Sequence, residues 1–147
     1  MIRKTAINSA LYFLKFRPRS VFEIQRKLKQ KKFPDVEIDK TINLLKEQGF
    51  LNDLEFARMW IRNRNLLKPM GKRLLFLELR KLGVESEIIE KALEIEDLDE
   101  SSKAKMVFEK KKKYLSKLPT EEFKKKMIGL MSRRGFSWDI IKQVLEK

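Results

Sequence analysis

Apolar residues recur at intervals of three and four along the whole chain, and this spacing constrains the fold more than any other feature. Ile24 and Leu28 show the interval of four, whereas Leu75, Leu79 and Leu82 show both intervals. Such spacing places an apolar stripe along one side of a helix, whereas a half-buried strand would need strict alternation. We therefore predict an all-α protein.

Capping signals and glycines divide this pattern into nine short helices. Ser20 and Glu23 have the spacing of a capping box, and Asp53 is a further expected N-cap. Glycine adopts the left-handed conformation at a helix end without steric cost, so three glycines are expected to be structural: Gly49, Gly83 and Gly135. The predicted helices cover residues 4–16, 20–32, 35–48, 53–68, 71–82, 86–96, 100–117, 120–134 and 137–146.

Similar segments recur about every 51 residues, which groups the helices in threes. LGVESEIIEKAL at 82–93 aligns without a gap with RGFSWDIIKQVL at 134–145. The copy at 31–42 keeps the apolar phase but has Lys32 in place of the glycine, so that helix is expected to end differently. The repeats predict three tandem three-helix, helix-turn-helix-like units over 1–50, 51–98 and 99–147. Each is too small for much core of its own, so neighbours should pack end to end in an elongated array, straight or curved.

The charge balance is strongly basic, with 35 lysines and arginines against 21 acidic residues and a net charge of +14. Residues 1–50 carry 12 basic and 5 acidic side chains, residues 51–100 carry 9 and 11, and residues 101–147 carry 14 and 5. Two basic ends around a near-neutral middle indicate a polyanionic partner, either nucleic acid or a carboxylate-rich protein. The alternative is that the excess charge only keeps the chain in solution.

The absence of Cys and His excludes disulfides, thiol and imidazole catalysis, and zinc sites built from those residues. No apolar run is long enough to span a membrane, and the first residues indicate a helix rather than a signal peptide. No carboxylate cluster or glycine-rich phosphate loop indicates an enzyme. We expect a cytoplasmic, non-enzymatic protein without cofactor, metal or membrane association.

Four segments together resemble the RecX family, the bacterial regulators of the RecA recombinase. They are ALYFLKFRPRSVFEIQRKL at 10–28, GFLNDLEFARMWIRNR at 49–64, GKRLLFLELRKLGV at 71–84 and RRGFSWDIIKQVL at 133–145. The resemblance covers almost the whole chain. It implies a protein that binds the RecA–DNA filament along its groove and inhibits recombinase, ATPase and co-protease activity, thereby contributing to control of DNA repair and the SOS response. The alternative is a basic helical protein that binds single- or double-stranded DNA nonspecifically in its own right.

A helical wheel of the predicted helix 53–68 separates core residues from surface residues. Phe56 and Trp60 lie on the apolar stripe and are expected in the core, with stacking of Trp60 on a base as the alternative. Arg64 lies inside the same stripe, where an unpaired guanidinium would be desolvated. We therefore expect Arg64 to be structural and to pair with a carboxylate such as Glu78.

Two pairs of cations in the middle unit are candidates for partner contact. Arg58 and Arg62 lie opposite the apolar stripe, and the alternative is a solvated pair of like charges. Lys72 and Arg73 lie at a helix start, where the helix dipole disfavours cations. A partner's acid or phosphate could compensate there, and solvation is the alternative.

The lysine runs 110–113 and 124–126 spread around their helices and cannot all face one narrow groove. They suit nonspecific phosphate attraction, or else form a solvated face. Carboxylates at the start of each third helix argue against sequence-specific reading of DNA. The candidates for partner or DNA contact are Arg17, Arg19, Arg58, Arg62, Lys72, Arg73, Lys110, Lys111, Lys124, Lys125 and Arg133.

Overall fold

The computed structural model describes residues 5–96 and 98–146, which form nine α-helices and no strand. The predicted all-α fold is therefore confirmed over these two ranges. Each helix end lies within two residues of its predicted position. The helices are α1 (Ala6–Phe16), α2 (Val21–Gln30), α3 (Asp35–Glu47), α4 (Asp53–Leu67), α5 (Lys72–Lys81), α6 (Ser86–Glu96), α7 (Glu100–Leu115), α8 (Thr120–Arg133) and α9 (Trp138–Leu145).

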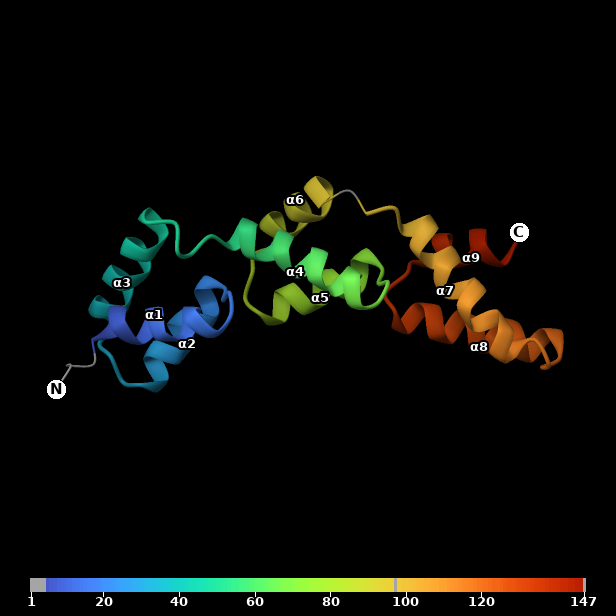
Figure 1. The fold of residues 1–147 in the computed structure, drawn as a ribbon, viewed down its shortest axis with the longest axis horizontal. Helices are drawn as coiled ribbons and strands as arrows, with labels where there is room; N and C mark the ends of the chain where they lie inside the picture. Colours follow the sequence, from blue (N-terminus) through green and yellow to red (C-terminus); the bar gives the residue numbers. More distant parts are fainter. Residues whose placement is uncertain (1–4, 97, 147) are drawn as a thin grey trace.

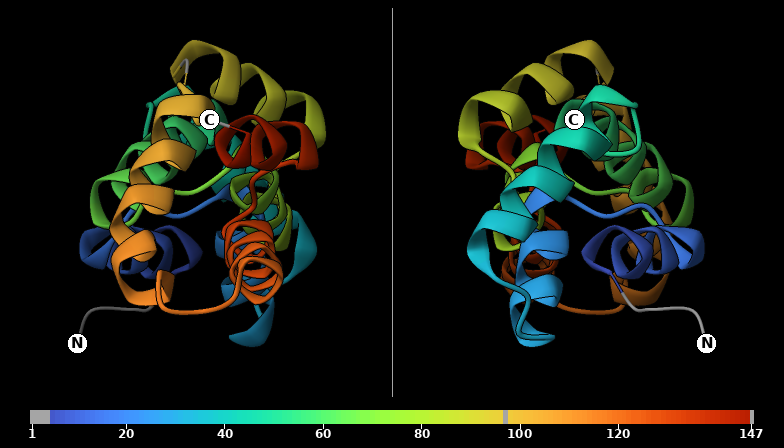
Figure 2. Two further views of the ribbon diagram at one scale, coloured as in Figure 1. Left: turned by 90° about the vertical axis from the view of Figure 1, so that its right-hand side faces the viewer. Right: turned by 90° about the vertical axis from the view of Figure 1, so that its left-hand side faces the viewer.

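The helices form three groups of three that follow one another along the long axis of the molecule (Figure 1). The first group contains α1 to α3, the second α4 to α6 and the third α7 to α9. Viewed along that axis the molecule is narrow, because the three groups lie one behind another (Figure 2). The structure thus has the predicted tandem three-helix units in an elongated array.

Each unit contains its own hydrophobic core, and the expectation of little core within a unit is wrong. Ile24 and Leu28 are fully buried in the first unit, Leu75 and Leu79 in the second, and Met131 in the third. Each cluster of buried apolar residues is drawn from one group of three helices and its turns, and the first also includes Leu51, which lies in the link from α3 to α4. The reason is that the apolar stripes of three short helices point to one centre, so that each stripe is covered by the other two helices of its unit.

Helix-ending turns in the left-handed conformation occur at Gly49, Gly83 and Gly135, as predicted, and also at Lys32. The φ angle of Lys32 is 66°, and its helix closes with the N–H of Lys32 bonded to the Lys29 carbonyl and the next N–H to the Leu28 carbonyl. The turns at the three glycines make the same pair of hydrogen bonds. The expectation that Lys32 ends its helix differently is therefore wrong: these bonds offset a left-handed penalty of about 1 kcal/mol.

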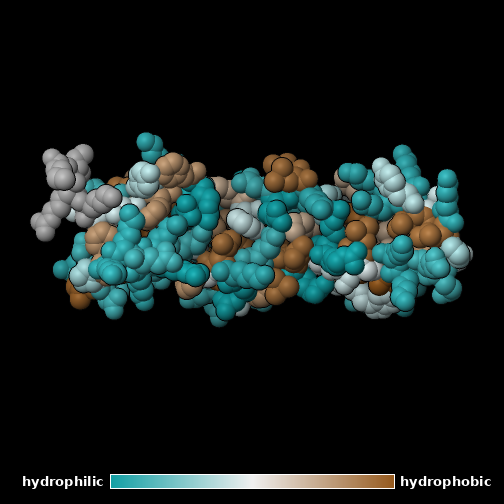
Figure 3. All heavy atoms as spheres, turned by 90° about the horizontal axis from the view of Figure 1, so that it is seen from below, coloured by the Kyte–Doolittle hydropathy of each residue, from teal (hydrophilic) through white to brown (hydrophobic). Residues whose placement is uncertain are grey.

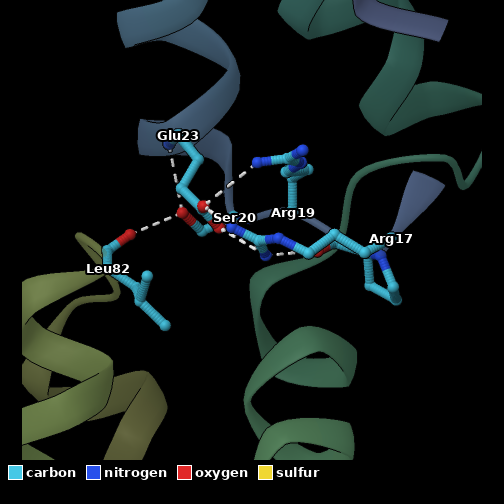
Figure 4. Close-up of polar contacts among 6 residues, drawn as sticks. Arg17, Arg19, Ser20, Glu23 and Leu82 are labelled. Atoms are coloured by element: carbon cyan, nitrogen blue, oxygen red, sulfur yellow. Dashed lines mark hydrogen bonds and ion pairs between the residues drawn. The ribbon is translucent and has the colours of Figure 1, made fainter. Parts of the chain in front are cut away.

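The first joint between units sets the start of α2 against the end of α5 (Figure 4). Ser20, the N-cap of α2, is fully buried. Its hydroxyl accepts the N–H of Glu23 and donates to the Leu82 carbonyl oxygen at 2.5 Å, while the Glu23 carboxylate accepts the Ser20 N–H at 3.1 Å. The predicted capping box is confirmed, and the same hydroxyl also holds two units together.

Asp53 contributes a second bond to this joint instead of capping α4. The cap of α4 is Asn52, whose side chain accepts the N–H of Glu55 at 3.2 Å, so the predicted N-cap at Asp53 is displaced by one residue. This frees the Asp53 carboxylate to accept the Val21 N–H of the first unit at 2.9 Å. Burial raises the pKa of Asp53, and the bond from Val21 opposes that rise.

The second joint repeats this arrangement between the start of α5 and the end of α8. The N–H of Gly71, the N-cap of α5, donates to the Arg134 carbonyl oxygen at 2.8 Å. The Arg73 guanidinium donates to the Ser132 carbonyl oxygen, also at 2.8 Å. In both joints, therefore, the N-cap residue donates a hydrogen bond to the carbonyl of the residue just before a left-handed glycine. Ser20 donates through its hydroxyl to Leu82, and Gly71 donates through its N–H to Arg134.

Close backbone approach makes glycine necessary in both joints. A Cβ at Gly83 would lie 2.2 Å from the Cβ of Phe22, and a Cβ at Gly135 would lie 2.3 Å from the Cβ of Leu74. A Cβ at Gly71 would lie 2.1 Å from the carbonyl oxygen of Gly135. Neighbouring units thus touch through a few backbone and side-chain contacts at each joint, while their cores remain separate clusters.

Candidate nucleic-acid and partner interface

Arg17 and Arg19 both lie against the carboxylate of the capping box, although the Arg17 side chain remains 41% exposed (Figure 4). Arg17 forms an ion pair with Glu23 at Oε2, and Arg19 Nη1 lies 3.8 Å from the same oxygen. Burial lowers the pKa of Arg19, Arg17 lowers it further, and Glu23 opposes both. Both arginines therefore help to fix the start of α2 at the first joint.

Arg58 and Arg62 are bridged by a single carboxylate. Nε of Arg58 lies 3.0 Å from Oε2 of Glu96, and Nε of Arg62 lies 2.8 Å from Oε1 of the same group. The Glu96 side chain is only 9% exposed, and its hydrogen bond is the main cause of a raised pKa for Arg58. The structure therefore has neither an unpaired basic pair nor a solvated pair of like charges here, because α6 packs along α4 and ends between the two guanidiniums. Contact of these arginines with a partner stays a prediction.

Arg64 occupies the structural position predicted for it. Its Nη2 lies 2.7 Å from Oε2 of Glu78, and its Nε donates to Oε1 at 3.1 Å. The indole N–H of Trp60 donates to the same Oε1 at 3.0 Å, while Phe56 is buried in the core of the second unit. The predicted pair with Glu78 and the core position of Phe56 are confirmed, and Trp60 packs against the same core with its polar atom satisfied.

The start of α5 is held by groups of the third unit. The backbone N–H of Lys72 donates to a carboxylate oxygen of Glu100 at 3.1 Å. Arg73 is held by its bond across the second joint. A carboxylate of α7 therefore caps the first N–H of α5. The side chain of Lys72 forms no ion pair within the described residues, and its contact with a partner stays a prediction.

Basic residues converge in the third unit, where α7 and α8 border an open groove of about 730 Å³. Three of the predicted candidates, Lys111, Lys125 and Arg133, line it, together with Lys126 of the lysine run 124–126 and with Tyr114, neither of which was a candidate. None of its lining residues is acidic, and none of these four cations forms an ion pair within the described part of the chain. Lys124 does not line the groove.

A second basic hollow adjoins this groove and crosses the joint between the second and third units. Lys68, Lys110, Lys111 and Arg134 line it around an apolar floor that includes Met106, again without a carboxylate. Burial lowers the pKa of Arg134. Because Lys111 belongs to both hollows, they form one continuous surface, which we call the basic face.

Hydrophilic side chains cover most of the side of the array shown in Figure 3, with hydrophobic patches between them. None of the helices in 5–96 and 98–146 has the length and apolar character that crossing a membrane requires. Within the same ranges, no three acidic side chains are grouped so that they could hold a metal ion.

Comparison with known proteins gives one consistent result. Models of the first, second and third three-helix domains of RecX match residues 6–45, 52–93 and 99–145. Regulatory protein RecX of Prosthecochloris aestuarii is 36% identical over 98% of this chain and 93% of its own length. That of Geobacillus sp. (strain WCH70) is 36% identical over 97% of this chain. The chain spans about half the length of this second relative, with 53% covered.

Solved structures agree with the sequence comparisons. The crystal structure of RecX from Lactobacillus salivarius superposes with a TM-score of 0.88 at 26% identity, covering 96% of this chain and 92% of that one. A second crystal structure, of a regulatory protein RecX, gives a TM-score of 0.84 at 20% identity, which supports the fold. Three matching domains in the expected order, a close relative of nearly equal length and the shared fold lead to one conclusion: the chain belongs to the RecX family of regulatory proteins.

Proposed function

We propose that this protein regulates a RecA recombinase in the cytoplasm by binding along the helical groove of the RecA–DNA filament. Binding there would inhibit strand exchange, ATP hydrolysis and co-protease activity, and so restrain the SOS response. Family membership supports the proposal, and the basic face without carboxylates carries it, because it can contact a polyanion without prior release of an internal partner.

The distribution of ion pairs directs this contact to the third unit. Arg17, Arg58, Arg62 and Arg64 are already neutralised by carboxylates of their own units. A polyanion would have to compete with these carboxylates, whereas the cations of the basic face offer their charge directly. DNA contact of this kind is nonspecific in sequence and strongly dependent on salt.

The elongated shape suits a groove that runs over several protomers. The three cores are separate clusters and neighbouring units meet at two small joints, so a change of angle at a joint need not disturb the cores. Such an array can follow a helical groove, with the first two units on protein and the third near DNA.

The test is RecA-driven DNA strand exchange and DNA-dependent ATP hydrolysis with the protein present at well below the recombinase concentration. We expect inhibition by the wild type and weaker inhibition by the K125Q/K126Q variant. The K112Q/K113Q variant serves as the control, because it removes the same charge from α7 outside the basic face. Absence of inhibition, together with no binding to preformed filaments at moderate salt, would defeat the proposal.

A second candidate function is direct binding of DNA without any recombinase. The basic face favours this alternative as well, since nothing in its lining requires a protein partner. Tight binding to bare DNA at physiological salt, combined with no effect on strand exchange, would support the second function over the first.

A further inference from the structure

We infer that the groove between α7 and α8 binds a single strand of nucleic acid, with an unpaired base stacked on Tyr114 and phosphates held by Lys111, Lys125, Lys126 and Arg133. This deepens the proposed function and rests on it for the choice of nucleic acid as the polyanion. To the proposed function it adds a binding site, a binding mode and a preference for unpaired strands.

Tyr114 is positioned as a stacking platform. It lies in the last turn of α7, where its side chain is 76% exposed, and the core of the third unit is built without it. Nζ of Lys111 lies over the ring at 5.8 Å from its centre, so a cation already sits beside this exposed aromatic ring. Aromatic rings beside cations are the usual means by which proteins bind unpaired bases without reading their sequence.

The cations lie on both walls of the groove, as a strand with a continuous phosphate backbone requires. Lys111 comes from α7, whereas Lys125, Lys126 and Arg133 come from α8. The eight-residue separation of Lys125 and Arg133 corresponds to about 12 Å along the helix. Cations this far apart can contact more than one phosphate of a bound strand.

Gly129 keeps the floor of this groove low. Glycine is unfavourable within a helix, yet it occupies the middle of α8 and lines the groove. A Cβ at this position would meet one atom only, Nη1 of Arg133, at 3.3 Å. The glycine therefore serves no close packing of backbones and instead leaves the Arg133 guanidinium room to lie over the helix.

An unpaired strand fits these features better than a duplex or an acidic peptide. A duplex keeps its bases stacked inside, so Tyr114 could reach only sugar and phosphate. An acidic peptide would satisfy the cations but offer no regular array of flat rings to the tyrosine. The combination of an exposed ring with unpaired cations on both walls is therefore the deciding observation.

The experiment measures binding of the full chain to a short fluorescein-labelled oligo(dT) by anisotropy, with no recombinase present and across a range of salt. Y114A should weaken binding by between about fivefold and about a hundredfold without changing the salt dependence, while Y114F should bind like the wild type. K125Q/K126Q should reduce the slope of log affinity against log salt by about 1.4, because each phosphate contact to a single strand contributes about 0.7.

The matched control is K112Q/K113Q, which removes two charges from α7 outside the groove and should change the slope much less. Equal loss in both double variants, unchanged binding by Y114A, equal affinity for duplex DNA, or Tyr114-dependent binding of a poly-glutamate peptide would each overturn the inference. Absence of strand binding with filament inhibition intact overturns this site alone. Strand binding without inhibition overturns only the proposed function.

Discussion

Substituting Gly71 by alanine should uncouple the second and third units without unfolding either of them. The φ of Gly71 is −81°, which alanine adopts readily, so no backbone strain enters the comparison. The new Cβ would lie 2.1 Å from the carbonyl oxygen of Gly135, a contact that two backbones can relieve only by moving apart. The hydrogen bond from Gly71 to Arg134 would then be lost, together with that from Arg73.

These bonds set the size of the expected effect. A backbone hydrogen bond contributes about 0.5 to 1.5 kcal/mol net, and the exposed bond from Arg73 contributes about as much. The joint should therefore weaken by about 1 to 3 kcal/mol, which corresponds to an increase of roughly 5- to 150-fold in the population of the opened joint. Replacing glycine by alanine at the N-cap of α5 weakens this region by a further few tenths of a kcal/mol or more.

Hydrogen exchange read by NMR provides the assay. The Gly71 amide should exchange faster by the factor above, while amides in the cores of both units keep their protection. G129A is the matched control: its Cβ meets only a flexible guanidinium, so it should stabilise α8 by up to about 1 kcal/mol. Unchanged exchange at position 71 would refute the close-approach argument, and loss of protection in both cores would refute the separation of the cores.

Three further predictions concern single side chains and are checked by thermal melting. E96A should lower the free energy of unfolding by about 1 to 2 kcal/mol, because it leaves Arg58 and Arg62 without their shared carboxylate. Since burial raises the pKa of Asp53, its contribution to stability is full in acid and is lost as pH rises through that pKa. D53N should therefore gain stability relative to wild type as pH rises through the Asp53 pKa, whereas D53A should lose about 1 to 3 kcal/mol with the acceptor. K32G should stabilise the first unit by about 1 kcal/mol by relieving its left-handed residue.

Features set within one helix or one turn could be predicted from the sequence. Residue spacing alone shows that Arg64 lies on an apolar stripe and must be paired, and that Ser20 and Glu23 cap each other. The left-handed turn at Gly83 likewise follows from one residue and its neighbours. These features depend on helix geometry, which is the same whatever the helix packs against.

Features set between helices could not be predicted in this way. A wheel shows that Arg58 and Arg62 point away from the core of α4, but not that α6 ends with Glu96 between them. The choice of Lys126 rather than Lys124 for the groove depends on the rotation of α8 against α7, which small differences in packing decide. The sequence therefore predicted that this region is basic, but it did not show which of the basic residues line the same groove.

The left-handed residue of the first unit has a consequence for self-association. Gly83 and Gly135 each receive the helix start of the preceding unit, and a Cβ at either would collide with it. Lys32 occupies the equivalent position of the first unit and carries a full side chain. A second copy that used the same joint would meet the side chain of Lys32 where the two internal joints have glycine. This side chain disfavours association of copies through that joint, although the units of one chain stack head to tail.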